Sequence, residues 1–347
     1  MATAIGVIGS AITIFNFATD LFPSPDTNNV MYRLVIGNDG ATGPYGGVLS
    51  NAGGNKPDVR AWDPTGQFLG IETNDNNKCN EGNRVCDTKI DGVNQTPDYT
   101  LFTANNDALC ISVAKTTYPD NIHFACTIGN WAHSCGEYHG VDAAHWFYSD
   151  QTVKRQDGGA DTNVKCAWID ANGDQPATGI QIHWPDFASQ NQGGRSSADY
   201  CNAHPTLFWH TDDDPSYVVR YGRKRNMFAE KPSTIDQSPA APSLRERSAR
   251  SLSNSLAQKL VRSYLPEQSA SELCGARNSA GPSFVSYEER AFCFMPTKTV
   301  FPFCEDVALG ACWSDELQIV TPKLVDVLVP QMNFTLTAVW ENTVLVE

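Results

Sequence analysis

The chain has 347 residues, of which 41% are hydrophobic and only 18% are charged, and its formal net charge at pH 7 is −14. A chain of this length accommodates one large domain and a smaller one, because single domains usually have roughly 100–200 residues. The negative charge argues against nucleic acid as a partner, since phosphate binding requires an excess of Lys and Arg on one face.

The N-terminal segment carries large apolar residues three or four positions apart, which predicts an amphipathic helix within residues 1–25, ended by Pro23 and Pro25. These apolar residues are Ile5, Ile8, Ile12 and Phe15. We expect the helix to pack on a core; the alternative is contact with a membrane through this helix, although it lacks the basic face of interfacial helices. The segment has no basic n-region and no clear cleavage site, so either a signal peptide has been removed or the protein is cytosolic; the cysteines favour the first alternative.

Residues 26–215 alternate short apolar runs with Gly, Asn, Asp and Pro, the pattern of strands joined by tight turns. Several runs alternate polar and apolar positions, as a sheet with one buried face requires. We therefore predict a mainly β fold, with a β-sandwich-like domain over these residues. The candidate strands are residues 31–37, 58–63, 68–73, 99–104, 109–115, 122–129, 145–150, 164–170 and 179–184.

Residues 216–268 are predicted to form a basic linker rich in Pro, Ser and Ala. Between Val219 and Arg262 there are ten basic and three acidic residues, a net charge of +7. With so few large apolar residues, such a segment does not bury enough surface to fold alone. Its dibasic pair, Lys224 and Arg225, has the form that processing proteases of the secretory pathway cleave; the alternative is a solvated charge run.

The 11 cysteines lack the paired C-x-x-C spacing of a structural zinc site, which favours disulfides formed in an oxidising compartment. Four of them fall in residues 269–347 and predict a small disulfide-rich module with two disulfides. Seven precede the linker, which leaves one cysteine free or in a bridge across the linker. The cysteines are Cys79, Cys86, Cys110, Cys126, Cys135, Cys166, Cys201, Cys274, Cys293, Cys304 and Cys312.

Two N-glycosylation sequons, at Asn94 and Asn333, agree with the secreted, extracellular or cell-wall location that the cysteines predict.

Several long runs resemble an uncharacterised family of cysteine-containing proteins secreted by ascomycete fungi. The resemblance covers most of the chain and implies a secreted protein. It implies no catalytic residue, because the family has no established activity. The runs are DVRAWDPTGQFLGIE (58–72), YTLFTANNDALCISVA (99–114), IGNWAHSCG (128–136), HWFYSD (145–150), CAWIDANGDQPATGIQIHWPDF (166–187) and SASELCGARNSAGPSFVSYEERAFCFMPTKTVFPFC (269–304).

A candidate calcium site lies at Asp170, Asn172 and Asp174, which offer oxygen ligands at alternate positions around Gly173. The twelfth position of the loop is Gln181 rather than the bidentate Glu of an EF-hand, so a complete EF-hand is excluded. The remaining alternatives are a Ca²⁺ site completed by other oxygens and a plain hairpin turn.

The histidines near Cys135 show no H-E-x-x-H motif, so we expect hydrogen-bonded loop histidines rather than a zinc site. These histidines are His133, His139 and His145, and His204 and His210 follow. The alternative is a metal site assembled from Glu137, His139, His204 and Asp212. The neighbouring carboxylates of Asp212, Asp213 and Asp214 repel one another unless a cation lies beside them; the alternative is an exposed acidic loop.

Six tryptophans of the β region are expected to fill the core, and one or two exposed ones would form a sugar-stacking platform. They are Trp62, Trp131, Trp146, Trp168, Trp184 and Trp209. The sequence has no G-x-S-x-G, no P-loop and no G-x-G-x-x-G, so no nucleophile or phosphate site is predicted and enzyme activity stays open.

Three hypotheses for the function remain, and we rank them in the following order. The first is a secreted binding protein for cell-wall glycan or a host surface. The second is a toxin or effector, matured at the basic linker, that acts on membranes. The third is an extracellular metal-dependent hydrolase.

Overall fold

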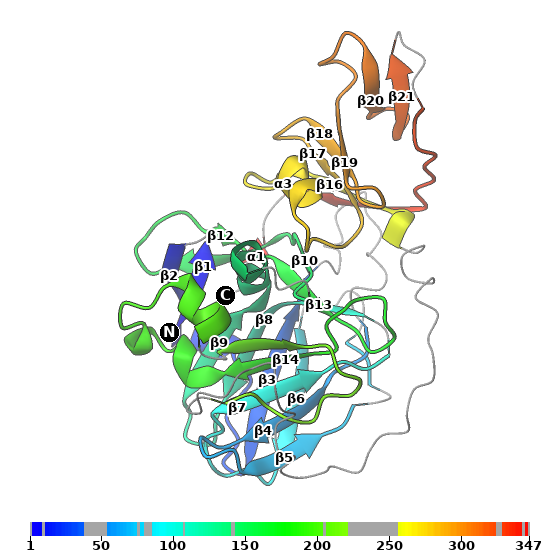
Figure 1. The fold of residues 1–347 in the computed structure, drawn as a ribbon. Coiled ribbons are helices and arrows are strands. Elements are labelled where there is room, and N and C mark those ends of the chain that lie inside the picture. Colours follow the sequence, from blue (N-terminus) through cyan, green and yellow to red (C-terminus); the bar gives the residue numbers. More distant parts are fainter. Residues whose placement is uncertain are drawn as a thin grey trace.

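The structure is a computed structural model that describes residues 2–8, 11–37, 54–74, 77–79, 85–106, 108–139, 143–203, 206–220, 256–323, 328–341 and 344–345. It is mainly β, with several antiparallel sheets and five disulfides. Residues up to 220 form the larger part of the molecule, and most of the C-terminal strands lie at one end of it (Figure 1).

The N-terminus forms a β-hairpin of β1 (Ala2–Ile8) and β2 (Ala11–Phe17), so the predicted N-terminal helix is wrong. Ile5 and Val7 pack in the largest core cluster, whereas Phe15 packs in a second cluster on the other side. Because both faces of the hairpin are covered, the sequence shows no clean two-residue alternation, and its apolar spacing imitates that of a helix.

The predicted contact with a membrane through an N-terminal helix therefore loses the element on which it depended. Among the described residues, no helix combines the length and the apolar character needed to cross a bilayer.

The residues between the hairpin and residue 220 form two larger antiparallel sheets, and all nine predicted strands are present. One has the order β10-β13-β8-β3-β6, with β9 paired to β8. Its strands are β3 (Asn29–Ile36), β6 (Val85–Asp91), β8 (Leu109–Thr117), β9 (His123–Thr127), β10 (Trp146–Phe147) and β13 (Cys166–Ile169). The other has the order β15-β14-β7-β4-β5. Its strands are β4 (Asp58–Trp62), β5 (Phe68–Glu72), β7 (Tyr99–Thr103), β14 (Gly179–His183) and β15 (Leu207–His210).

The side chains of these two sheets meet in the core. The Tyr32 ring of β3 makes an edge contact with Phe102 of β7, with centroids 5.7 Å apart. The hydroxyl of Thr100 lies 3.0 Å from the Tyr32 hydroxyl and accepts a hydrogen bond from the indole of Trp184. The polar atoms of these buried aromatic side chains thus have partners where the sheets face each other.

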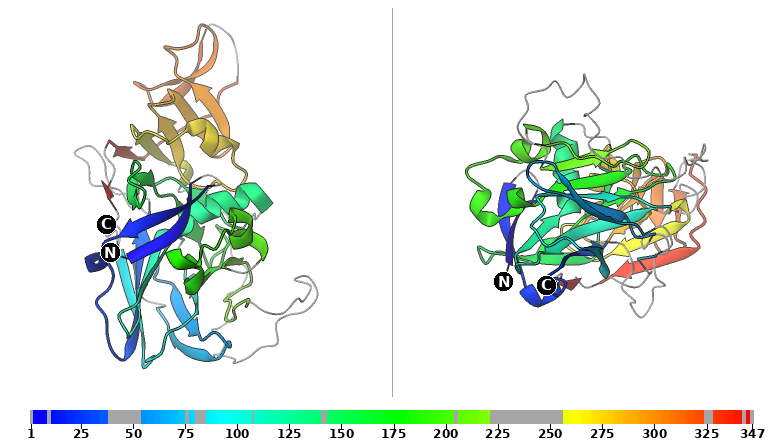
Figure 2. Two further views of the ribbon diagram at one scale, coloured as in Figure 1. Left: turned by 90° about the vertical axis from the view of Figure 1, so that its left-hand side faces the viewer. Right: turned by 90° about the horizontal axis from the view of Figure 1, so that it is seen from below.

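The hairpin belongs to a third sheet, of order β1-β2-β11-β12, with β11 (Gln151–Arg155) and β12 (Thr162–Asn163). The last strand, β23 (Val344–Leu345), pairs in parallel with β11. The C-terminal strand therefore returns to the N-terminal sheet, as the views in Figure 2 show.

The long helix α1 (Ile128–His139) begins where the predicted strand 122–129 ends. A side chain on Gly129 would lie 2.0 Å from the backbone of Lys165, so glycine lets α1 pack directly on the segment before β13. The short helices are η1 (Thr19–Leu21), η2 (Trp184–Phe187), η3 (Ser189–Asn191) and η4 (Asp199–Ala203).

The C-terminal module begins earlier than residue 269, because β16 (Lys259–Ser263) lies within the predicted linker. Val218, at the other end of that predicted linker, is buried against Trp62 and Leu101 of the larger part. The module contains a sheet of order β19-β18-β17-β16-β22 and a two-stranded sheet, β20-β21. Its elements are β16, α3 (Ala270–Gly275), β17 (Ser283–Ser286), β18 (Ala291–Phe294), β19 (Thr299–Pro302), β20 (Gly310–Ser314), β21 (Ile319–Lys323) and β22 (Leu336–Trp340).

The disulfides are local to each part of the chain. Three lie in the larger part: Cys79–Cys86, Cys110–Cys166 and Cys135–Cys201. Two lie in the module, as predicted: Cys274–Cys293 and Cys304–Cys312. Cys126 is free and buried, so the odd cysteine does not bridge the two parts.

Candidate functional site

The structure does not bring the predicted histidines together. His133 lies in α1, His145 directly precedes β10, and His210 ends β15. The side chains of Glu137 and His139, and the whole of His204, lie outside the described residues. Within the part of the chain that is described, no three His, Cys, Asp or Glu side chains are grouped to hold a metal ion.

The acidic loop of Asp212 to Asp214 has a positive partner within the larger part. The guanidinium of Arg60, on β4, lies 3.3 Å from a carboxylate oxygen of Asp214 and donates a hydrogen bond to the Thr103 hydroxyl. Asp212 accepts a hydrogen bond from the hydroxyl of Tyr217. All three aspartates are exposed, so the segment is an exposed acidic loop, and Arg60 of the sheet is the positive partner of Asp214.

The tryptophans fill the core, as expected, and none is exposed to form a sugar-stacking platform. All eight tryptophans are buried, and the most exposed of them, Trp209, is only 6% exposed. Their indoles fill the core, where their large apolar area contributes most to stability.

The other predicted surface sites have different outcomes. Asn94 and Asn333 are both exposed, so each sequon is accessible for glycosylation. Lys224 and Arg225 lie outside the described residues.

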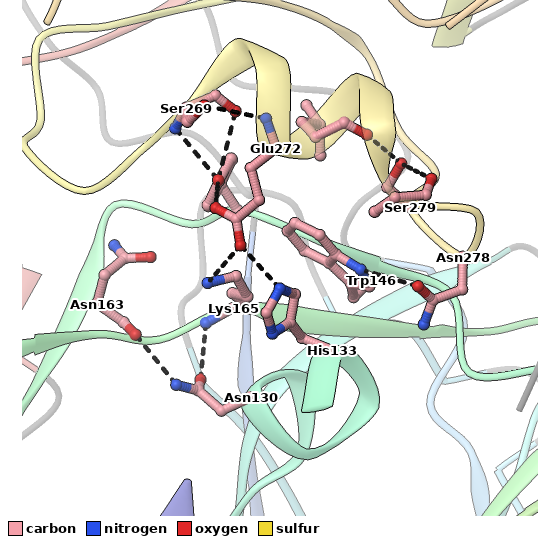
Figure 3. Close-up of polar contacts among 12 residues, drawn as sticks. Asn130, His133, Trp146, Asn163, Lys165, Ser269, Glu272, Asn278 and Ser279 are labelled. Carbon is pink, nitrogen blue, oxygen red and sulfur yellow. Dashed lines mark hydrogen bonds and ion pairs between the residues drawn. The ribbon is translucent and has the colours of Figure 1, made fainter. Parts of the chain in front are cut away.

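A partly buried ion cluster joins the module to the larger part (Figure 3). The side chain of Glu272, on α3, lies 2.7 Å from Nε2 of His133 and 3.9 Å from Nζ of Lys165. It also accepts a hydrogen bond from the hydroxyl of Tyr148. Burial opposes the ionisation of Glu272, but His133, Lys165 and Tyr148 outweigh it and lower its pKa to about 2. The carboxylate therefore stays charged at the junction.

The start of α3 explains why Glu272 points across the junction. Ser269 caps the helix, and its hydroxyl accepts a hydrogen bond from the backbone N–H of Glu272. This is half of a capping box, in which the glutamate normally turns back to the cap. Here its side chain reaches His133 of α1 instead, so the cap orients the residue that docks the module.

Close packing of neutral groups completes the junction. The indole of Trp146 donates to the side chain of Asn278 over 3.2 Å, and that of Trp168 donates to the carbonyl of Ala280 over 2.8 Å. A side chain on Gly136 of α1 would lie 1.8 Å from Asn278, so only glycine allows this approach. Phe147 packs against Phe284 of the module. The two parts thus share one core.

A second cluster of aromatic and charged side chains lies at the surface of the module. The parallel register of β16 and β17 pairs Ser263 with Ser286, which places the next residues, Tyr264 and Tyr287, side by side. Adjacent strands lie about 4.8 Å apart, so in-register aromatic side chains of parallel strands stack. Their rings are parallel, with centroids 3.9 Å apart, and Tyr264 is 45% exposed.

Arg262 and Asp315 hold this stack in place. Arg262 lies two residues before Tyr264, on the same face of β16, and its guanidinium is 5.3 Å from the Tyr287 ring centroid. It donates to the Tyr287 hydroxyl and to Asp315, which follows β20. The Tyr287 hydroxyl donates to Asp315 over 2.8 Å. Burial, reinforced by Tyr264 and Asp315, raises the pKa of Tyr287, so its hydroxyl remains a donor.

Sequence reasoning missed this tyrosine site because its residues come from three separate segments. The sequence held two signals: the alternation Arg262-x-Tyr264, and Tyr287, which comes directly after the run Ser283–Ser286. Neither signal specifies that β16 and β17 pair in parallel, and only that register brings the rings together.

His183, at the end of β14, forms a buried ion pair that makes stability depend on pH. Its Nδ1 lies 2.7 Å from a carboxylate oxygen of Asp186 and its Nε2 lies 3.7 Å from one of Asp98. Burial lowers the pKa of His183, but the two carboxylates outweigh burial and raise it above 6.5.

The raised pKa of His183 predicts that its contribution to stability is complete below pH 6.5 and is lost as pH rises through the folded-state pKa. Replacing His183 with Gln is expected to remove this decline. The measurement is the free energy of unfolding in urea from pH 5 to 9 for both proteins. A difference between them that does not change with pH would contradict the assignment.

Comparison with family models, with characterised proteins and with solved structures finds no match for this chain. The tyrosine site and the junction therefore have to be interpreted from their own chemistry.

Proposed function

We propose that the chain is a secreted fungal protein that binds a neutral glycan at the tyrosine site of its C-terminal module. The observation that carries this proposal is the exposed Tyr264 ring, held flat against Tyr287 beside Arg262 and Asp315. We also propose that the sheets of β3 and β7 form a β-sandwich. The five disulfides support secretion, because disulfides form in oxidising compartments.

The chemistry of the site suits a sugar. A pyranose presents an apolar C–H face that packs on an aromatic ring, while its hydroxyls need donors and acceptors at the ring edge. Tyr264 offers the flat apolar surface, and the guanidinium of Arg262 and the carboxylate of Asp315 are both partly exposed beside it. Because Tyr287 already fixes the ring, binding loses little side-chain entropy. The net charge of −14 favours a neutral glycan over an acidic one.

The distribution of exposed apolar residues also favours the module as the binding part. Of the eight large hydrophobic side chains exposed among the described residues, only Val85 and Ile122 belong to the larger part. The other six belong to the module: Tyr264, Val300, Leu309, Leu317, Ile319 and Leu328. Exposed apolar groups concentrated in one region are typical of an interaction surface.

Replacing Tyr264 with Ala is expected to weaken glycan binding by roughly 5- to 150-fold, because losing a stacked aromatic contact costs roughly 1–3 kcal/mol. The measurement is co-sedimentation of the full chain with insoluble chitin, β-1,3-glucan and mannan, followed by titration of the polysaccharide that binds.

The matched control is Ile122→Ala, which removes an equally exposed side chain from the larger part and should bind as the wild type does. Leu317→Ala removes another exposed apolar side chain of the module. Comparing its glycan binding with that of Tyr264→Ala distinguishes binding at the tyrosine site from binding to the general apolar surface of the module. Equal binding by Tyr264→Ala and the wild type would contradict the proposal.

A further inference from the structure

The loop of residues 170–175 connects β13 of one large sheet to β14 of the other. Asp170 is fully buried, and one of its carboxylate oxygens, Oδ2, accepts backbone hydrogen bonds from Asp174 and Gln175 over 2.7 and 3.4 Å. The carboxylate therefore lies inside the loop rather than in solvent. Asn172 adds a side-chain oxygen that is 3.3 Å from the backbone nitrogen of Asp174.

Two carboxylate oxygens in this loop are buried and have no hydrogen-bond partner: Oδ1 of Asp170 and Oδ1 of Asp174. A buried acceptor without a partner costs free energy, and two nearby carboxylates without a cation repel each other. Turn formation explains Oδ2 of Asp170 but leaves both Oδ1 oxygens unexplained.

We propose that this loop binds a calcium ion, with Oδ1 of Asp170 and Oδ1 of Asp174 as its two anionic ligands. The side-chain oxygen of Asn172, backbone carbonyls and water supply the remaining ligands. An all-oxygen set from a short, irregular loop suits Ca²⁺, which accepts six to eight oxygens in flexible geometry. Mg²⁺ requires near-ideal octahedral geometry and usually keeps several of its water ligands. The buried position of Asp170 disfavours an ion that keeps a shell of water.

A bound calcium ion would strengthen the connection between the two large sheets. Asp170 bonds through its backbone N–H to Ala177, and the side chain of Gln175 lies 2.8 Å from Nδ1 of His145. Trp168, two residues before the loop, donates to Ala280 of the module. The ion would thus stabilise a segment that contacts both sheets and the junction.

The buried indole of Trp168 allows a direct test with terbium, which occupies calcium sites and luminesces when a nearby tryptophan is excited. The full chain, stripped with EDTA, is titrated with Tb³⁺, and the bound Tb³⁺ is then displaced with Ca²⁺ or Mg²⁺. We expect luminescence that Ca²⁺ abolishes at far lower concentration than Mg²⁺. We also expect Ca²⁺ at about a hundred times its Kd to raise the Tm by about 5 °C.

The variants Asp170→Asn and Asp174→Asn keep the shape of each side chain and remove one charge. Each is expected to weaken Ca²⁺ binding at least about tenfold. Without calcium, Asp170→Asn should be at least as stable as the wild type, because it removes a buried charge; with calcium the order should reverse. The control Asp213→Asn removes an exposed carboxylate from the acidic loop and should bind Ca²⁺ normally.

The proposal is overturned if the wild type shows neither Tb³⁺ luminescence nor a Ca²⁺-dependent rise in Tm. It is also overturned if Asp170→Asn and Asp174→Asn respond to Ca²⁺ as the wild type does, because the ion then binds elsewhere. Glycan binding by the same samples is a separate readout, so failure here leaves the tyrosine site untouched.

Discussion

Replacing both cysteines of the Cys110–Cys166 disulfide with Ala is expected to lower the free energy of unfolding by about 4 kcal/mol. The bridge joins β8 to β13, and its two cysteines are 56 positions apart in the sequence. A cross-link over such a long loop removes much of the chain entropy of the unfolded state. Both cysteines are completely buried, so the variant also loses packing.

The matched control is the pair Cys79→Ala and Cys86→Ala, which opens a bridge with a separation of only 7 residues. The same chain-entropy argument gives a cost of about 2.5 kcal/mol for this shorter loop. Urea unfolding followed by circular dichroism measures both. If the short-loop variant lost as much stability as the long-loop variant, the entropic account of these disulfides would be wrong.

Replacing Glu272 with Gln is expected to cost about 2 kcal/mol and to loosen the docking of the module. Removing one partner of a fully buried ion pair costs roughly 3–5 kcal/mol, and the value is reduced here because the Glu272 side chain is 34% exposed. The change leaves Lys165 and His133 facing a neutral amide in place of a carboxylate.

The lowered pKa of Glu272 makes the stability of the protein depend on pH in the acid range. Its stabilising contribution is present above the ordinary value of 4.5 and is lost as pH falls from there towards about 2. The wild type should therefore lose stability over this range more steeply than Glu272→Gln does.

Hydrogen exchange of β16 and β17, together with urea unfolding, measures docking and stability in the same samples. The control Glu288→Gln makes the same chemical change at an exposed position of the module and should have little effect. Equal exchange rates in Glu272→Gln and the wild type would show that the ion cluster does not hold the module.

Much of the β structure could be predicted from the sequence because turn residues mark the ends of its strands. Runs such as 58–63 and 99–104 alternate with Gly, Asn, Asp and Pro, and both form strands of one sheet. The hairpin of β1 and β2 could not be distinguished from a helix, because Ile5 and Phe15 are buried on opposite faces.

The helix α1 was missed for a different reason. Gly129 and Gly136 lower its intrinsic helix propensity, and both are required by contacts with Lys165 and Asn278, which are distant in the sequence. The composition of a segment does not reveal such tertiary contacts, so a helix held mainly by packing looks like a loop.

The candidate sites show the same limit. The oxygen ligands at Asp170, Asn172 and Asp174 could be recognised because they lie within one loop. The tyrosine site could not, because it depends on the register of two parallel strands and on Asp315 from a third segment. The tryptophans were correctly predicted to lie in the core, because a large aromatic residue is more often buried than exposed.

Hydrogen–deuterium exchange with and without a soluble oligosaccharide of the polysaccharide that binds is the most direct test of the proposed function. We predict slower exchange in β16, in the segment around Tyr287 and in the β20–β21 turn that carries Asp315, with the larger part unchanged. Protection confined to residues 26–220, with the tyrosine site unaffected, would contradict the proposal that the module binds the glycan.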